Sequence, residues 1–205
     1  MAHVEPLPRE TVREFEEAFR PLEERMGFLP NSVLTMARKP DLLKAFSALG
    51  RAVYAPTENV PLSLKNMVAH VASAAAGCRY CMAHTASNAN RPAGKVEEEK
   101  IERLWNFEVD PIFSEKERVT LSFAAAAASV PNLAEPEHFE ALRRFYTDDD
   151  IVEIVSVIAY FGFLNRWNDT MATDLEPIPL GVGAAQLKDG GWTPGKHAAQ
   201  GAKAR

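Results

Sequence analysis

Two cysteines stand three residues apart in this chain, and they are the only cysteines among its 205 residues. Cys78 and Cys81 lie in the segment Leu64–His84, which also holds two of the five histidines, His70 and His84. Side chains three residues apart meet on one face of a helix, so the two thiols can cycle between a dithiol and a disulfide. The segment therefore indicates redox chemistry on sulfur.

The residues before the cysteines predict a helix, a bend and a second helix. Val68, Val71 and Ala72 recur at helical spacing without the alternation of a strand. Gly77 permits a bend directly before Cys78. A helix that begins at Cys78 places its sulfur near unpaired N–H groups, at the positive end of the helix dipole. Such an environment lowers the pKa of a thiol, so we expect a reactive dithiol at a helix N-terminus.

Other interpretations of the cysteines stay open. Two small buried residues in an Ala-rich core would need no function, but this leaves the spacing unexplained. A zinc site of Cys78, Cys81, His84 and His70 has an acceptable ligand count, although a single helix does not easily wrap four ligands tetrahedrally. Attached c-type haem is nearly excluded, because that site needs His directly after the second Cys, where Met82 stands. We expect no metal and no cofactor.

Helical geometry assigns roles to these residues. His84 follows Cys81 by three residues and neighbours it on the helix, but it is rotated away from Cys78. His84 is thus the natural proton acceptor for Cys81. In this hypothesis Cys81 attacks a peroxide O–O bond and becomes a sulfenic acid, Cys78 condenses with it to a disulfide, and an external dithiol restores both.

These residues resemble those of a known family. Gly77-Cys-Arg-Tyr-Cys-Met-Ala-His84, preceded by the Ala/Val-rich helix, is similar to the alkylhydroperoxidase D-like branch of the carboxymuconolactone decarboxylase family, and most of all to its peroxidase-related members. The resemblance covers most of residues 25–178 and is also sharp at Phe163-Leu-Asn-Arg-Trp. It implies an all-helical fold, a cytoplasmic oligomer, and a thiol peroxidase recharged by a partner dithiol, with Cys81 as the peroxidatic and Cys78 as the resolving cysteine.

The chain departs from the family pattern at two places. The family His usually stands four residues after the second Cys, where this chain has Thr85, so His84 comes one position early. The family also has a Glu in its proton relay at the position of Asn66, which can orient a water but cannot take a proton. His70, one turn further along, is a candidate substitute, and Tyr80 is a further supporting candidate.

Composition excludes several function classes. A net charge of −5 argues against nucleic-acid binding, which calls for a basic patch. No window approaches the apolar length of a membrane span, and the N-terminus lacks the pattern of a signal peptide. Two cysteines so close together do not make a secreted disulfide scaffold. These features favour a cytoplasmic thiol protein without a membrane or nucleic-acid partner.

Hydrophobic periodicity and capping residues predict an all-α bundle. Residues 1–10 are expected to be a flexible lead. The expected helices are Thr11 to Met26, ended by Gly27; a short one from Pro30-Asn31; one from Pro40-Asp41 to Val53; the Cys-bearing pair; one opened by the Ser114-Glu-Lys-Glu117 capping box; residues 137–146; and Ile151 to Leu164, capped by Thr147.

An internal repeat is also predicted. A shift of 87 residues lays Cys78-Arg-Tyr-Cys81 on Asn165-Arg-Trp-Asn168, and Asn66 on Glu153. We infer one helical domain, residues 1–176, with related units at 41–91 and 114–174, followed by an extended C-terminal tail, 177–205. Chance similarity between two buried helices remains the alternative.

The sequence as a whole predicts a thiol-dependent peroxidase that reduces organic peroxides through Cys81, Cys78 and His84. Its expected partners are a lipoyl- or thioredoxin-like dithiol reductant and further copies of the chain, as a dimer or trimer. Two alternatives stay open. One is a redox-inactive or redox-sensing member of the family, and the other is a decarboxylase or lactone-processing enzyme of the same fold.

Overall fold

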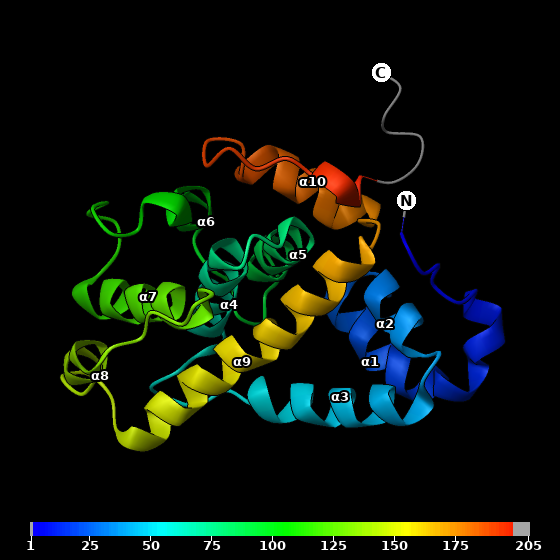
Figure 1. Ribbon diagram of the computed structural model, residues 1–205, viewed down its shortest axis with the longest axis horizontal. Coiled ribbons are helices and arrows are strands. Elements are labelled where there is room, and N and C mark those ends of the chain that lie inside the picture. The colour runs from blue at the N-terminus through cyan, green and yellow to red at the C-terminus, as the bar shows by residue number, and fades with distance from the viewer. Residues whose placement is uncertain (1, 199–205) are drawn as a thin grey trace.

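The computed structural model describes residues 2–198, and every regular element in that part of the chain is helical (Figure 1). The predicted all-α fold is confirmed. The α-helices are α1 (Glu16–Met26), α2 (Asn31–Met36), α3 (Pro40–Val53), α4 (Leu62–Ala75), α5 (Arg79–Ala89), α6 (Glu98–Arg103), α7 (Glu115–Ala128), α8 (Pro136–Leu142), α9 (Asp148–Met171) and α10 (Pro177–Gln186), and the 3-10 helices are η1 (Arg9–Phe15), η2 (Leu104–Asn106) and η3 (Gly195–His197).

Helix α4 is the centre of the core, and every residue from Leu64 to Ser73 is buried. It packs against α5, α7 and α9, and small side chains such as Ala69 and Ala72 allow these helices to approach closely. After α4 the chain turns at Gly77, whose φ of 72° lies in the left-handed region that favours glycine. The predicted bend before Cys78 is therefore confirmed.

Helix α9 is the longest element and crosses the molecule diagonally in Figure 1. Its start is the predicted cap, because Thr147 Oγ1 accepts the N–H of Asp150 and Asp150 Oδ2 accepts the N–H of Thr147. The helix continues to Met171, well past the predicted end at Leu164. Buried contacts of Asn165 and Asn168 with α4 and α5 offset the modest helix propensity of asparagine.

The predicted extended tail is wrong for the described part of residues 177–205. Pro177 occupies the first turn of α10, whose Leu180 and Val182 pack against the core, and the helix lies on α5. The chain then returns along α10, where Trp192 packs on Gly183 and donates its Nε1–H to the carbonyl of Arg79 at 3.0 Å. Burial of these apolar side chains outweighs the weak helix propensity of the Gly-rich segment. Residues 199–205 lie outside the described residues.

The N-terminal segment also differs from expectation. The helix expected from Thr11 is divided, because Val12 has a non-helical φ of −120° inside η1 and α1 begins only at Glu16. The expected flexible lead is fixed from Ala2 onward. Ala2 is buried, and the N–H of His3 donates to the carbonyl of Met171 at 2.8 Å. The start of the chain is therefore held against the end of α9.

Helices α2, α3 and α7 begin where the sequence predicted. Pro40 lies in the first turn of α3, and Ser114 and Glu117 form the predicted capping box of α7. The helix predicted over residues 137–146 ends earlier, at Leu142.

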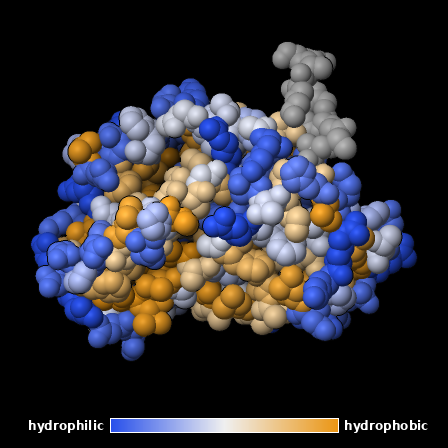
Figure 2. All heavy atoms as spheres, viewed as in Figure 1, coloured by the Kyte–Doolittle hydropathy of each residue, from blue (hydrophilic) through white to orange (hydrophobic). Residues whose placement is uncertain are grey.

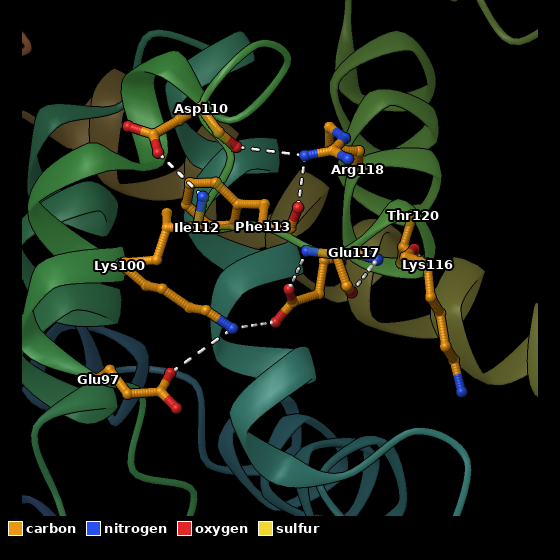
Figure 3. A network of polar contacts seen from close by, with 10 residues as sticks. Glu97, Lys100, Asp110, Ile112, Phe113, Lys116, Glu117, Arg118 and Thr120 are labelled. Atoms are coloured by element: carbon orange, nitrogen blue, oxygen red, sulfur yellow. Dashed lines mark hydrogen bonds and ion pairs between the residues drawn. The ribbon is translucent and has the colours of Figure 1, made fainter.

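A charged network joins α6 to α7 (Figure 3). Lys100 Nζ lies 2.7 Å from Glu117 Oε1 and 3.6 Å from Glu97 Oε2. The same Glu117 carboxylate accepts the backbone N–H of Ser114 at 2.7 Å. One side chain therefore fixes both the start of α7 and its distance from α6.

The surface carries exposed apolar residues on two neighbouring helices. Val152, Val155 and Phe163 of α9 are 68%, 39% and 38% exposed, and Leu49 of α3 is 50% exposed. Figure 2 shows apolar residues gathered along the lower part of this face, where α9 and α3 lie in Figure 1. Among the described residues, no helix combines the length and the apolar character that crossing a membrane requires.

The internal repeat and the domain division built on it stay predictions. The first unit breaks at Gly77 between α4 and α5, whereas α9 runs on as one helix through the corresponding position.

Alanine substitutions at two glycines of α10 test whether Trp192 packs on this helix. A Cβ on Gly183 would come within 2.6 Å of the Trp192 ring, whereas a Cβ on Gly181 meets nothing within 4 Å. We expect Gly183→Ala to lower the free energy of unfolding by about 1–3 kcal/mol, as overpacking does. Gly181→Ala, in the same helix, should raise it by about 0.5–1 kcal/mol through helix propensity. Urea unfolding measures both, and equal effects of the two variants would contradict the packing of Trp192 on α10.

Candidate active site

A cavity of about 370 Å³ lies between α1, α3, α5 and α9. Most of its wall is apolar, with Phe19 and Leu22 from α1, Phe46 from α3, and Phe161 and Leu164 from α9. Cavities of this size and character hold small organic molecules.

The two cysteines occupy different positions around this cavity. Cys78 is the N-cap of α5, and its Sγ accepts the backbone N–H of Cys81 at 3.4 Å. Both thiols are free and buried, but only Cys81 lines the cavity. The predicted proximity of the two thiols is present, because their side chains are within hydrogen-bonding distance, and Cys78 itself does not line the cavity.

The thiol environment differs from the expectation. Burial raises the pKa of the Cys81 thiol well above its ordinary value, and the neighbouring Cys78 sulfur raises that pKa further. The Asn168 amide, which donates to Cys81 Sγ at 3.6 Å, opposes the shift without reversing it. The lowering of a thiol pKa was predicted for Cys78 at the helix N-terminus, whereas at Cys81 desolvation is the largest cause and raises the pKa. A base must take its proton when it reacts.

His84 belongs to a buried cluster with Glu176 and Tyr80. Its Nε2 lies 2.7 Å from Glu176 Oε2, while the Tyr80 hydroxyl donates to Glu176 Oε1 at 2.9 Å. The rings of Tyr80 and His84 stack with their centroids 4.1 Å apart, and the backbone N–H of Asn31 also donates to Glu176 Oε1. The imidazole is held in one orientation from two sides.

The charge of Glu176 decides which nitrogen of His84 carries the proton. Burial acts to raise the pKa of Glu176, but the charge and hydrogen bond of His84 and the N–H of Asn31 outweigh it and lower that pKa below its usual value. An ionised carboxylate only accepts hydrogen bonds, so His84 donates from Nε2. Nδ1 is then the ring nitrogen that does not contact Glu176.

The described residues form no hydrogen bond between His84 and Cys81, although both side chains line the cavity. A molecule bound there would contact both, so the predicted role of His84 stays a prediction. Tyr80 was expected to support the site, and it contacts both Glu176, through its hydroxyl, and His84, through its ring.

Asn66 and His70 lie away from the cavity wall. Asn66 Nδ2 donates to the carbonyl of Gly94 at 2.9 Å, and His70 Nδ1 pairs with Thr85 Oγ1 at 3.0 Å. Neither side chain lines the cavity or contacts a cysteine through a hydrogen bond within residues 2–198. The carboxylate beside the histidine comes instead from Glu176, at the start of α10.

The histidines and thiols are not arranged as a metal centre. Within residues 2–198, no group of three or more His, Cys, Asp or Glu side chains is placed to hold a metal ion. His70 and His84 point to separate partners, Thr85 and Glu176.

Comparisons with known proteins place this arrangement in a family. The profile of the carboxymuconolactone decarboxylase family matches residues 40–126, from α3 to α7. The crystal structure of the debrominase Bmp8 is 37% identical, with a TM-score of 0.81, over 87% of this chain and 95% of that chain. The chain belongs to the carboxymuconolactone decarboxylase family.

Other solved structures of similar fold extend the comparison. A Bmp8 variant with a cysteine-to-alanine substitution, in complex with 2,3,4-tribromopyrrole, is likewise 37% identical, with a TM-score of 0.81, over 87% of this chain and 94% of that chain. A peroxidase-related protein from Silicibacter sp. TM1040 is 28% identical, with a TM-score of 0.69, over 85% of this chain and 89% of that chain. A peroxidase-related protein from Ralstonia eutropha JMP134, with an alkylhydroperoxidase AhpD core, is 24% identical, with a TM-score of 0.72, over 85% of this chain and 93% of that chain. The comparison with curated protein sequences gives no match.

Two residues of the site escaped the sequence analysis. Glu176 is 92 positions from His84 and stands alone before Pro177, so no spacing connects it to the cysteines. Asn168 had a signal, because the predicted repeat lays it on Cys81, and the structure brings these two side chains together. The repeat assigned it no function.

The lowered pKa of buried His70 predicts how the free energy of unfolding depends on pH. Burial lowers the pKa of His70 to about 4, from 6.5. The unfolded chain therefore binds a proton between these pH values that the folded chain does not. Stability should fall by about 3 kcal/mol as the pH drops from 6.5 to 4, at 1.36 kcal/mol per pKa unit. We expect His70→Asn, whose amide can replace Nδ1 at Thr85, to flatten this part of the curve in urea titrations. An unchanged slope would refute a buried neutral His70.

Proposed function

We propose that this protein is a dithiol oxidoreductase that reduces a small organic substrate in the cavity by two electrons. One observation carries the proposal: Cys81 faces an apolar cavity, while Cys78 Sγ lies 3.4 Å from the Cys81 backbone nitrogen. Cys81 can attack a bound molecule from the cavity wall. Cys78, beside it, is close enough to close a disulfide in the next step.

The first candidate substrate is an organic peroxide. The Cys81 thiolate attacks the outer oxygen, the O–O bond breaks, and Cys81 becomes a sulfenic acid while the alkoxide takes a proton from His84. The Cys78 sulfur then attacks Cys81, the hydroxyl leaves as water, and a disulfide remains. A lipoyl- or thioredoxin-like dithiol supplies the two electrons that restore both thiols.

The second candidate substrate is a brominated aromatic molecule, and the 37% identity with the debrominase Bmp8 favours it. Here the Cys81 thiolate takes the bromine, and the electron pair of the carbon–bromine bond stays on carbon, which takes a proton from His84. The Cys78 sulfur then displaces bromide from Cys81, its proton passes to His84, and the disulfide closes. The residues and their order are the same in both reactions, and only the attacked atom differs.

In both reactions His84 first takes the proton of Cys81. The raised pKa of the buried thiol makes this step necessary at neutral pH. The Glu176 carboxylate, 2.7 Å from Nε2, stabilises the imidazolium that results. Glu176 itself does not line the cavity, so it acts as a positioning residue for His84.

Further proposals accompany this function. Exposed Val152, Val155 and Phe163 on α9 support a homo-oligomer, because contiguous apolar surface is typical of interfaces. A cytoplasmic location suits free thiols that are recharged by a dithiol. A redox-sensing protein would close the disulfide once without turnover, and a decarboxylase or lactone-processing enzyme would need the cavity but no thiol pair.

Cysteine variants test the proposed reaction. The full-length protein would be assayed with dihydrolipoamide, measuring alcohol from cumene hydroperoxide and bromide from brominated pyrroles. We expect near-total loss of turnover for Cys81→Ser, which removes the nucleophile. Cys78→Ser should support a single oxidation without recycling, and its fold should persist because Ser is also a good N-cap.

The product identifies the substrate class. Alcohol formation selects the peroxide reaction, and bromide release selects debromination. Equal turnover in the wild type and both variants would exclude the dithiol mechanism, while a disulfide that forms without turnover would indicate a sensor.

Glu176→Gln tests the positioning role. We expect kcat at neutral pH to fall about 10²-fold with little change in KM, since general base catalysis contributes on that order. The deficit should shrink as the pH rises, because the Cys81 thiolate then forms without help from His84. Glu117→Gln, which alters the distant network of Figure 3, is the matched control and should leave kcat unchanged. A loss in Glu176→Gln that is independent of pH would argue for a purely structural role.

A further inference from the structure

Tyr54 brings a hydroxyl without a hydrogen-bond partner to the cavity. It follows α3 directly and lines the cavity, and its hydroxyl oxygen is shielded from solvent with no partner among residues 2–198. Buried hydroxyls are almost always paired, so an unpaired one beside a cavity suggests a group that a ligand completes. Burial also raises the pKa of Tyr54, so the phenol keeps its proton and offers a donor.

The charges around Tyr54 favour an anion. The Arg25 guanidinium lies 5.6 Å from the centroid of the Tyr54 ring and lines the same cavity. Within the described residues Arg25 has no ion-pair partner, and Arg51 is a second arginine on the cavity wall. Glu17 is the one carboxylate that lines it among these residues. Two guanidinium groups against one carboxylate attract a negatively charged ligand.

An aromatic wall holds Tyr54 in place. The ring of Tyr160 meets it edge-on at 6.2 Å between centroids, and Phe46 stacks on Tyr160 at 4.7 Å. Gly50 makes room for this arrangement, since a Cβ there would come within 2.8 Å of the Tyr160 hydroxyl. The wall suits a flat apolar molecule. Tyr54 and Cys81 line the same cavity, so both ends of one small ligand can be reached.

We propose that the cavity binds an aromatic substrate that carries an anionic oxygen, such as a carboxylate or phenolate. The Tyr54 hydroxyl donates a hydrogen bond to that oxygen, Arg25 balances its charge, and the apolar body extends toward Cys81. The identity of this ligand as a substrate rests on the proposed function, whereas its binding does not depend on turnover.

Binding to the full-length Cys81→Ser protein tests the proposal without chemistry. Calorimetry at neutral pH would compare para-bromobenzoate with para-bromotoluene, which has the same body without the anionic group. We expect the benzoate to bind at least about tenfold tighter, and Tyr54→Phe and Arg25→Gln each to weaken it about tenfold, as expected for a hydrogen bond or ion pair to a charged group. The affinity for bromotoluene should be unchanged in both variants. Arg20→Gln is the matched control, since Arg20 is exposed on α1 and does not line the cavity.

Several results would overturn the anionic subsite. These are equal binding of the two probes, no binding of the benzoate, or an equal loss of both probes in Tyr54→Phe and Arg25→Gln. The outcome is separate from that of the cysteine assays. Selective benzoate binding without any turnover refutes the oxidoreductase and keeps the subsite, whereas turnover without benzoate selectivity refutes only the subsite.

Discussion

The buried carboxylate of Glu176 is the constraint on which the site depends. A charge removed from water is tolerated only where donors replace its hydration, and here the donors come from two separate parts of the chain. Tyr80 and His84 lie on α5, and the Asn31 N–H lies at the start of α2. Glu176 itself precedes α10, so α2, α5 and α10 must meet at this point for the carboxylate to be stable. The same contacts that satisfy the charge therefore orient His84 toward the cavity.

The turn between α4 and α5 positions the two cysteines of the site. Because Gly77 adopts a left-handed conformation, α5 can start in a new direction with Cys78 as its cap and Cys81 in its first turn. Cys81 then lies against α9, where Asn168 donates to its sulfur, and on the wall of the cavity.

The geometry also explains how one framework can serve more than one reaction in this family. A thiol on the cavity wall, a second thiol beside it and a histidine held by a carboxylate can deliver two electrons and a proton to any soft electrophile that fits. The fold and the two thiols alone do not determine whether the attacked atom of the substrate is oxygen or bromine. Under the proposed function, this choice would depend on the part of the cavity wall that Tyr54, Arg25 and the aromatic side chains form.

By itself, the sequence determined the features that depend on neighbouring residues. Each of these features is encoded within a few positions of the chain, because contacts across one helical turn decide it. They are the caps at Ser114 and Thr147, the bend at Gly77, the helical periodicity, and the position of Cys78 and Cys81 on one turn. The family resemblance at the cysteines is equally local.

Only the tertiary structure decided the partner of His84, the protonation of Cys81 and the course of the chain after Pro177. Glu176 reaches His84 across 92 positions, and burial, which no local pattern reveals, raises the pKa of the Cys81 thiol. Asn66 and His70 looked suitable on the helix but were turned toward Gly94 and Thr85 by packing. Long-range burial sets these features, because desolvation and charge depend on what folds against a residue and not on what precedes it in the chain.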